Sequence, residues 1–338
     1  MRVGIVGAGL QARRRAPVIK AWPGAELVVI SAEHPDSAKA LASQMGCEAD
    51  VGWEWVARRR DVDVVLVCTP PRLHAAITIA ALQTGKHVLC EKPLAWSLEE
   101  AEEMRAVTRA TGLTVKCGFN HRHHPGIEQA HRWLDDGRLG EPLFIRCRYG
   151  ICGRPGYAKE WRGNADAVAG GQLMEQGIHG IDLARWFLGE LVDVNCMLGA
   201  PYFDLGPLED NAFATYRTER GRVLSIHSTL TQWKNLFSFE IFGHDGYALV
   251  KGLGGAYGTE RATFGKRDFH APFTEETVEF RGDDRSWREE WREFVHAIEE
   301  RRDPLGTVGD GIEAMRCVFA AYEAHRRNAT VRVESVGR

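Results

Sequence analysis

The chain lacks the features that mark export, membrane insertion or a strongly charged partner. No apolar run approaches the length of a membrane-spanning helix, and the opening residues MRVGIVGAG show no charged region followed by an apolar export segment. With 43 basic and 46 acidic residues the net charge is −3, which provides no field to attract nucleic acid or an anionic membrane. We therefore expect a cytoplasmic protein that binds neither.

Cysteine is present but is not arranged for a disulfide framework or a metal. The eight cysteines are scattered without a C-x-x-C pair, as in a protein from a reducing compartment. His121, His123 and His124 resemble a metal cluster, but no Cys, Asp or Glu set at zinc-like spacing accompanies them. Neighbours that alternate along a strand end also point in different directions. We expect no metal and a packing role for these histidines.

The first third of the chain has the pattern of a dinucleotide-binding unit. Gly7-Ala8-Gly9-Leu10-Gln11-Ala12 is a G-x-G-x-x-A between the strand-like runs RVGIVG and AELVVIS. Its first glycine permits a tight turn, its second lets the backbone approach a pyrophosphate, and its alanine lets the helix pack closely. Glu33 follows the second run, where an acid bonds a ribose hydroxyl and repels a 2′-phosphate. NAD is favoured, and NADP stays open.

Strand-like and helix-like segments continue to alternate up to about residue 118, which predicts a parallel, doubly wound sheet. Ligands of such sheets collect at the carboxyl ends of the strands. One of those ends carries Glu91-Lys92-Pro93. A lysine there can hydrogen-bond a substrate hydroxyl while hydride leaves the carbon, and a surface lysine before a turn proline is an equal alternative.

The stretch GGQLMEQGIHGIDLARWFLGE, residues 170–190, predicts a helix with a polar face. Glu175, His179 and Asp182 stand at i, i+4 and i+7, although from this spacing alone a solvated stripe is the simpler explanation. The glycines before the helix are expected to let the chain approach a cofactor. In the preceding loop, Trp161 and Arg162 suit a hydroxylated ring or a carboxylate; rim residues or a subunit contact are the alternative.

From about Leu143 onward, strand-like runs separated by glycine and proline turns predict a sheet domain with amphipathic helices near its end. A broad sheet needs its second face covered, which favours a homodimer or homotetramer formed through this sheet.

Four motifs together resemble the Gfo/Idh/MocA oxidoreductase family. They are GAGLQA, CTPPRLH with ALQTGKHVLCEKP, GFNHRHHP, and the GG before EQGIHGID, in the family's order from residue 3 to about 190. The resemblance implies an α/β fold: a Rossmann domain over 1–122, and over 123–338 a substrate-binding and oligomerisation domain with a large, mostly antiparallel open sheet. Two positions depart from the family pattern. Glu175 stands where aspartate is common, and Pro71 stands where asparagine often follows T-P.

The resemblance also implies the site. Lys92 and His179 would flank the substrate carbon as catalytic residues, with His179 as general acid or base. Glu175, the third catalytic candidate, would orient His179, touch the substrate or leave the relay altered. The implied cofactor-binding residues are Gly7, Gly9, Leu10, Gln11, Glu33, Thr69, Pro70, His74, Glu91, Lys92 and Asn120. Of the residues expected at the substrate, Arg122 matches a family position, Trp161 and Arg162 are the loop residues named above, and Asp182 is a supporting residue.

The leading hypothesis is an NAD-dependent oxidoreductase that transfers hydride between nicotinamide and a secondary alcohol or ketone of a sugar, inositol or related polyol. Two alternatives stand beside it. One is an NAD-assisted glycosidase or isomerase with transient redox and no net oxidation. The other is a non-catalytic dinucleotide-binding regulatory protein.

Overall fold

The computed structural model describes residues 1–270 and 274–335, which form two compact units. The first unit comprises 1–119, 167–169 and 287–313, and the second comprises 120–166, 170–286 and the chain from 314 onward. Among the described residues, none of the helices combines the length and the apolar content needed to cross a membrane.

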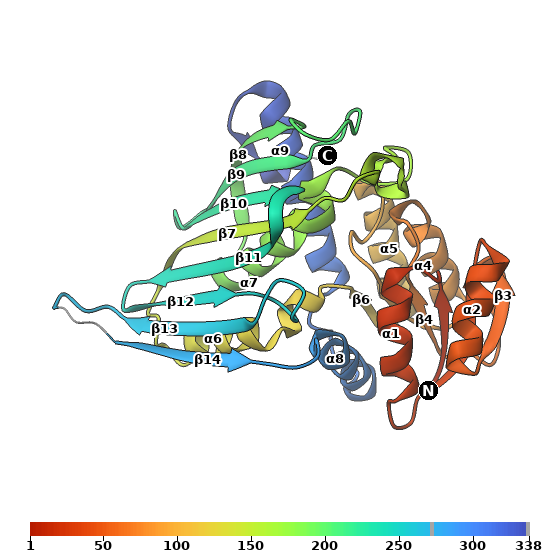
Figure 1. Cartoon of the computed structure of the whole chain (residues 1–338). Helices are drawn as coiled ribbons and strands as arrows, with labels where there is room; N and C mark the ends of the chain where they lie inside the picture. Colours follow the sequence, from red (N-terminus) through yellow and green to blue (C-terminus); the bar gives the residue numbers. More distant parts are fainter. Residues whose placement is uncertain (271–273, 336–338) are drawn as a thin grey trace. The chain divides into compact units, whose positions relative to one another are not determined.

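The first unit is a parallel sheet with helices between its strands (Figure 1). Its strands are β1 (Arg2–Val6), β2 (Glu26–Ala32), β3 (Glu48–Val51), β4 (Val64–Val67), β5 (His87–Cys90) and β6 (Val115–Cys117). Its helices are α1 (Leu10–Lys20), α2 (Pro35–Met45), α3 (Glu54–Arg58), α4 (His74–Gln83), α5 (Leu98–Thr111) and nearly all of α8 (Ser286–Glu300). The strand order β3-β2-β1-β4-β5-β6 reverses direction at β1 and β4, which confirms the predicted doubly wound sheet.

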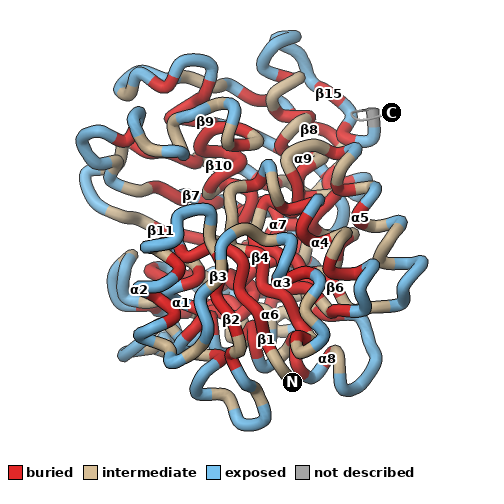
Figure 2. The backbone as a smooth tube through the Cα atoms, turned by 90° about the vertical axis from the view of Figure 1, so that its right-hand side faces the viewer, coloured by how far each residue is buried: buried red, intermediate tan, exposed pale blue. Residues whose placement is uncertain are grey.

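Local sequence explains most of these elements. β4 is buried at every residue, as its uninterrupted VVLV run requires in a parallel sheet, and Figure 2 shows the central strands buried along their length. The hydroxyl of Ser97 accepts a hydrogen bond from the amide of Glu100, which caps α5. Gly112 ends the same helix in the left-handed conformation, at φ 66°.

The second unit is built on a nine-stranded sheet of order β14-β13-β12-β11-β7-β10-β9-β8-β15. Its strands are β7 (Pro142–Cys152), β8 (Leu191–Gly199), β9 (Asn211–Thr218), β10 (Val223–Thr229), β11 (Thr231–Gly243), β12 (Gly246–Lys251), β13 (Glu260–Lys266), β14 (Glu275–Phe280) and β15 (Val331–Arg332). Its helices are α6 (Pro125–Asp135), α7 (Ile178–Leu188) and most of α9 (Val308–Arg327). All neighbouring strands are antiparallel except β7 and β10, which confirms the expected mostly antiparallel sheet.

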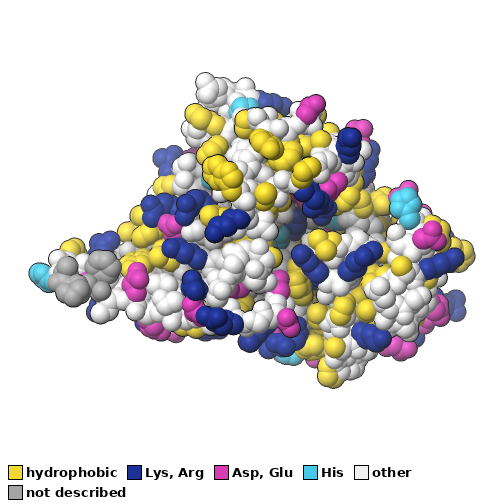
Figure 3. All heavy atoms as spheres, in the orientation of Figure 1, with side chains coloured by type: hydrophobic (Ala, Val, Ile, Leu, Met, Phe, Trp, Pro, Cys, Tyr) yellow, Lys and Arg dark blue, Asp and Glu magenta, His cyan; other side chains and the backbone are white. Residues whose placement is uncertain are grey.

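Helices cover one face of this sheet and leave the other open. α6 packs on β12 and β13, α7 packs on β7 and β10, and the hydroxyl of Tyr216 in β9 donates to the carbonyl of Cys317 in α9. On the opposite face, Met197 is 66% exposed and Phe213 is 54% exposed. Figure 3 shows apolar and basic side chains mixed over these strands. Within the chain, helices therefore cover only one of the two faces of this sheet.

A single buried arginine joins three separate parts of the first unit. Arg15 on α1 places Nε 2.7 Å from Glu91 Oε1 and Nη1 2.7 Å from Glu290 Oε2 on α8. Its guanidinium carbon lies 4.9 Å from the centre of the Trp287 ring. Burial acts to lower the pKa of Arg15, but the carboxylates of Glu290 and Glu91 raise it, so the group stays charged. One cation thus connects three elements: α1, the end of β5 and α8.

We expect replacement of Arg15 by methionine to destabilise the protein by about 3–5 kcal/mol, because two buried carboxylates then lose their counter-charge. Chemical unfolding measures this change. The matched control is Arg13→Met on the exposed side of the same helix, which should leave the unfolding midpoint nearly unchanged. Equal midpoints for the two variants would show that the network contributes nothing.

Candidate active site

The loop between β1 and α1 has the geometry of a phosphate-binding turn. Gly7 has φ 104°, and a Cβ there would lie 2.4 Å from the carbonyl oxygen of Cys68, so no other residue fits. Space around Gly9 is open, Leu10 is 55% exposed, and no side chain caps the start of α1. The first amides of this helix therefore point to a place where an anion can bind.

Polar atoms around this loop are suited to a polar ligand. The oxygens of Gln11, Ser31 and Thr69 are buried and make no hydrogen bond within the described part of the chain. Ser31 lies near the end of β2 and Thr69 follows β4, so these atoms gather where parallel strands end. Glu33 is exposed directly after β2, the position expected to face a ribose. These residues fit a dinucleotide.

His74 and Glu91, both predicted to contact the cofactor, make internal contacts. The His74 ring is fully buried, with Nδ1 2.8 Å from the carbonyl of Pro93 and Nε2 2.9 Å from the carbonyl of Thr69. Burial lowers the pKa of His74. The ring thus ties the loop after β4, which includes Pro70, to the loop that carries Lys92, while Glu91 is held by Arg15. Lys92 itself is half-buried at the end of β5.

In the second unit, His179 lies at the start of α7 and is only 4% exposed. The preceding segment, Leu173–Gly177, is a π-helical turn rather than the continuous α-helix that the sequence predicts. Such turns are frequent at functional sites. Glu175 lies within this turn and is 6% exposed. Glu175, His179 and Asp182 are all buried, which makes the alternative of a solvated stripe wrong.

The glycines before this helix serve packing within the unit. A Cβ on Gly170 would lie 2.3 Å from the Tyr322 hydroxyl, and one on Gly171 would lie 2.3 Å from Glu209 Oε2. The expectation that they allow approach to a cofactor gains no support from these contacts. Their small size lets the chain pass between α9 and the segment before β9.

The residues expected around the substrate occur as charge pairs. Arg122 donates through Nε at 2.8 Å and Nη2 at 2.6 Å to the two oxygens of Asp182, and both side chains are buried. Arg162 Nε lies 3.4 Å from Glu175 Oε2, and the Arg162 guanidinium lies 4.3 Å from the centre of the Trp161 ring. Each arginine therefore already faces a carboxylate.

In the sequence analysis His121 has only a packing role and Tyr149 is not singled out, but both lie beside His179. The ring of His121 stacks on that of His179, and the hydroxyl of Tyr149 reaches His121. The sequence places His121 on a strand end, but Asn120–His123 is a 3₁₀ turn. Side chains three residues apart share a side of such a turn. The three-residue spacing of His121 and His124, whose rings are in contact in the structure, was the signal available in the sequence.

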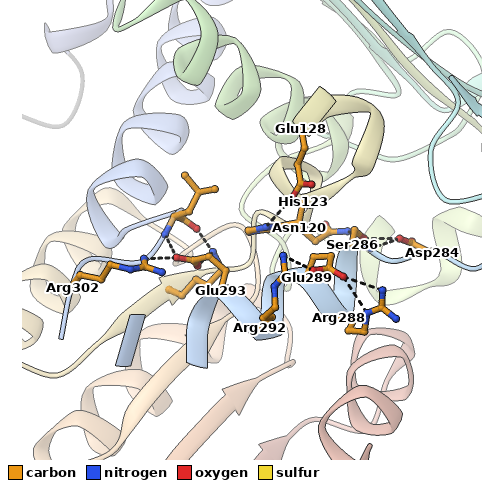
Figure 4. A network of polar contacts seen from close by, with 12 residues as sticks. Asn120, His123, Glu128, Asp284, Ser286, Arg288, Glu289, Arg292, Glu293 and Arg302 are labelled. Carbon is orange, nitrogen blue, oxygen red and sulfur yellow. Dashed lines mark hydrogen bonds and ion pairs between the residues drawn. The ribbon is translucent and has the colours of Figure 1, made fainter. Parts of the chain in front are cut away.

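Asn120 is fixed by contacts within its own unit. Its amide nitrogen lies 2.9 Å from the hydroxyl of Ser286, which in turn lies 2.6 Å from Asp284 (Figure 4). Across residues 1–270 and 274–335, no three His, Cys, Asp or Glu side chains converge as they would around a metal ion.

Comparison with known proteins identifies the chain. A model described as the oxidoreductase family with an NAD-binding Rossmann fold matches residues 1–119, and the GFO/IDH/MocA C-terminal domain matches residues 127–249. A levoglucosan dehydrogenase of Pseudarthrobacter phenanthrenivorans is 28% identical over 281 residues, 73% of this chain and 72% of the relative. A 1,5-anhydro-D-fructose reductase of Ensifer adhaerens is 31% identical over 254 residues, 72% of this chain and 74% of the relative.

A solved structure supports the same assignment. Levoglucosan dehydrogenase in complex with NADH matches with a TM-score of 0.89 and 25% identity, over 98% of this chain and 99% of that one. The glycine loop, the order of strands and the two domain matches agree with this likeness. The chain therefore belongs to the GFO/IDH/MocA oxidoreductase family and is an NAD-binding enzyme of the dehydrogenase and reductase class.

Proposed function

We propose that this enzyme oxidises a secondary alcohol, or reduces the matching ketone, of an uncharged sugar, inositol or related polyol. The observation that carries the proposal is the buried histidine at the start of α7, because a protein that only binds a dinucleotide has no need of a buried proton acceptor. The named relatives act on levoglucosan and 1,5-anhydro-D-fructose, which are sugar derivatives. The expected division of the chain at residues 122 and 123 stays a prediction.

The charge pairs favour a neutral substrate. A sugar acid or phosphate is bound best by an arginine whose charge is not already paired, whereas Arg122 binds both oxygens of Asp182 and Arg162 lies beside Glu175. Trp161 is 39% exposed and offers an aromatic face to the C–H side of a hydroxylated ring. A neutral polyol can use these groups through single hydrogen bonds without displacing a carboxylate.

In this proposal the bound nicotinamide supplies the acceptor or donor of hydride. Lys92 holds the substrate oxygen with its ammonium group, and His179 takes the hydroxyl proton as the C–H bond gives up its hydride. Alcohol and NAD⁺ thus yield ketone, NADH and a proton held on imidazole. Glu175 keeps Arg162 in place, and the Arg122–Asp182 pair fixes the turn that leads into α6.

Turnover tests this assignment directly. Purified protein with NAD⁺ and a panel of inositols, aldoses, levoglucosan and sugar acids should produce NADH with the neutral members. Lys92→Met should lower kcat at least ~100-fold and keep NADH affinity, because it removes the group that polarises the oxygen. Lys39→Met, an exposed lysine on α2, is the matched control.

Two results would contradict the proposal. Undiminished turnover in Lys92→Met removes the role of Lys92. Product formed without any change in free NADH indicates the alternative in which the redox step is transient and the enzyme acts as a glycosidase or isomerase.

Glu33 should set the cofactor preference. Its exposed carboxylate after β2 repels a 2′-phosphate, so NADH should bind at least ~10-fold more tightly than NADPH, and Glu33→Arg should remove or reverse that ratio. Fluorescence titration measures both constants. Glu26→Arg makes the same charge change at the opposite end of β2 and should leave the ratio unaltered. Preference of the unaltered protein for NADPH would refute this assignment.

We also propose that the open face of the nine-stranded sheet joins copies of this chain. A shallow depression of about 620 Å³ on that face is lined by Met197, Phe213, Arg146 and Glu240 among others, so apolar and oppositely charged groups lie side by side. A surface with both signs of charge can pair with a second copy of itself.

Phe213→Asp should convert the oligomer to monomers, because it places a charge in the apolar part of the interface. Sedimentation velocity distinguishes the species. Trp55→Asp on α3 replaces a side chain that is 67% exposed and serves as the control. A monomeric unaltered protein would overturn the proposal.

A further inference from the structure

The imidazole of His121 lies flat against that of His179. The ring centres are 3.8 Å apart and the planes differ by 18°, with His121 on the turn before α6 and His179 on α7. Both side chains are almost fully buried. Two aromatic rings in this arrangement fix each other's position, and a charge on one is felt directly by the other.

A chain of hydrogen bonds determines where His121 carries its hydrogen. Asp284 accepts from the hydroxyl of Ser286 at 2.6 Å, and the Ser286 oxygen accepts from the amide nitrogen of Asn120 at 2.9 Å (Figure 4). The amide oxygen of Asn120 therefore faces His121 Nδ1, at 3.1 Å. Because that oxygen can only accept, Nδ1 must be the donor.

The second nitrogen of His121 completes the assignment. Nε2 lies 2.9 Å from the hydroxyl of Tyr149 on β7. A neutral imidazole with hydrogen on Nδ1 has an acceptor at Nε2, so the tyrosine hydroxyl donates to it. Each group between Tyr149 and Asp284 then accepts one hydrogen bond from the preceding group and donates one to the next. The neutral Nδ1–H form satisfies both contacts without a second proton.

The groups beside His121 also make a second proton unfavourable. The His179 ring covers one face of the His121 ring. The His124 ring stands edge-on to His121, with 5.3 Å between their ring centres. Two carboxylates lie near His124: Glu260, which also accepts from the amides of Gly126 and Gly254, and Asp284, 3.9 Å from His124 Nδ1, which accepts from Ser286. The charge of each is thus shared with other donors rather than directed at His121.

We propose that His121 is a positioning residue for His179, locked as the neutral Nδ1–H tautomer by the chain that ends at Asp284. The inference rests on the proposed function, in which His179 takes the substrate proton. The imidazolium that results lies against a neutral aromatic face, which attracts a cation, whereas a charged neighbour at this distance would repel it. His121 therefore steadies the ring and favours its protonated form.

Nitrogen NMR of the full-length protein labelled in its 13 histidines tests the tautomer without reference to activity. His121→Phe identifies the signals of His121 by their loss. We expect one protonated nitrogen, Nδ1, and one unprotonated nitrogen, Nε2, at neutral pH. A hydrogen on Nε2, or hydrogens on both, would overturn the inference even if the enzyme is active.

Kinetics tests the positioning role. His121→Ala should lower kcat about 100-fold with little change in KM or NADH affinity, and His121→Phe, which keeps a flat ring, should recover about tenfold of that loss. Ser286→Ala should release the tautomer lock and lower kcat severalfold. The control is His131→Phe. His131 stacks on Trp186, with 3.8 Å between ring centres, and is not part of the hydrogen-bond chain from Tyr149 to Asp284, so its replacement should leave kcat unchanged.

Two outcomes separate this inference from the proposed function. If His179→Phe keeps full turnover, His179 is not the base and the proposed function fails, while the NMR result still decides the tautomer. If His179→Phe is inactive but His121→Ala and Ser286→Ala turn over normally, the function stands and the positioning role of His121 is wrong.

Discussion

One guanidinium sets the internal arrangement of the nucleotide-binding unit. Arg15 contacts Glu91 and Glu290, and the second of these is 275 positions away along the chain. Taking a cation out of water is costly, and only close carboxylates offset that cost. The arrangement therefore tolerates little displacement of α1, the end of β5 or α8. Because α1 begins at the glycine loop and Lys92 follows Glu91, the same contact fixes the phosphate turn relative to the lysine.

In the second unit, too, polar groups are buried away from water, and their partners are neutral groups or opposite charges. Its polar residues lie on α7 and on the turn before α6, where water cannot satisfy them. Asp182 accepts both donors of Arg122, so neither charge is left alone. Buried polar networks with every partner present favour one arrangement over its neighbours. This explains how a short 3₁₀ turn and a π-helical turn keep a defined geometry there.

Sequence predicted those parts of the structure that depend on local signals. The glycine loop and the alternating strands are each set by neighbouring residues, and the structure confirms them. Contacts between segments that lie far apart in the sequence could not be predicted from local patterns. No residue near Arg15 in the sequence indicates that it contacts Glu290. The stack of His121 on His179 depends on a 3₁₀ turn, whereas the preceding residues GFN have the pattern of a strand.

The candidate site residues share a further property that bears on substrate choice. In the second unit the permanent charges of Arg122, Asp182, Arg162 and Glu175 cancel in pairs, which leaves histidine as the group whose charge can change. A charged substrate would have to compete with an existing carboxylate for each arginine. In the proposed reaction a neutral polyol meets no such competition, and the proton that it releases passes to the ring of His179, which lies against the ring of His121. In that proposal, the pairing of arginines with carboxylates that stabilises this unit also disfavours anionic sugars as substrates.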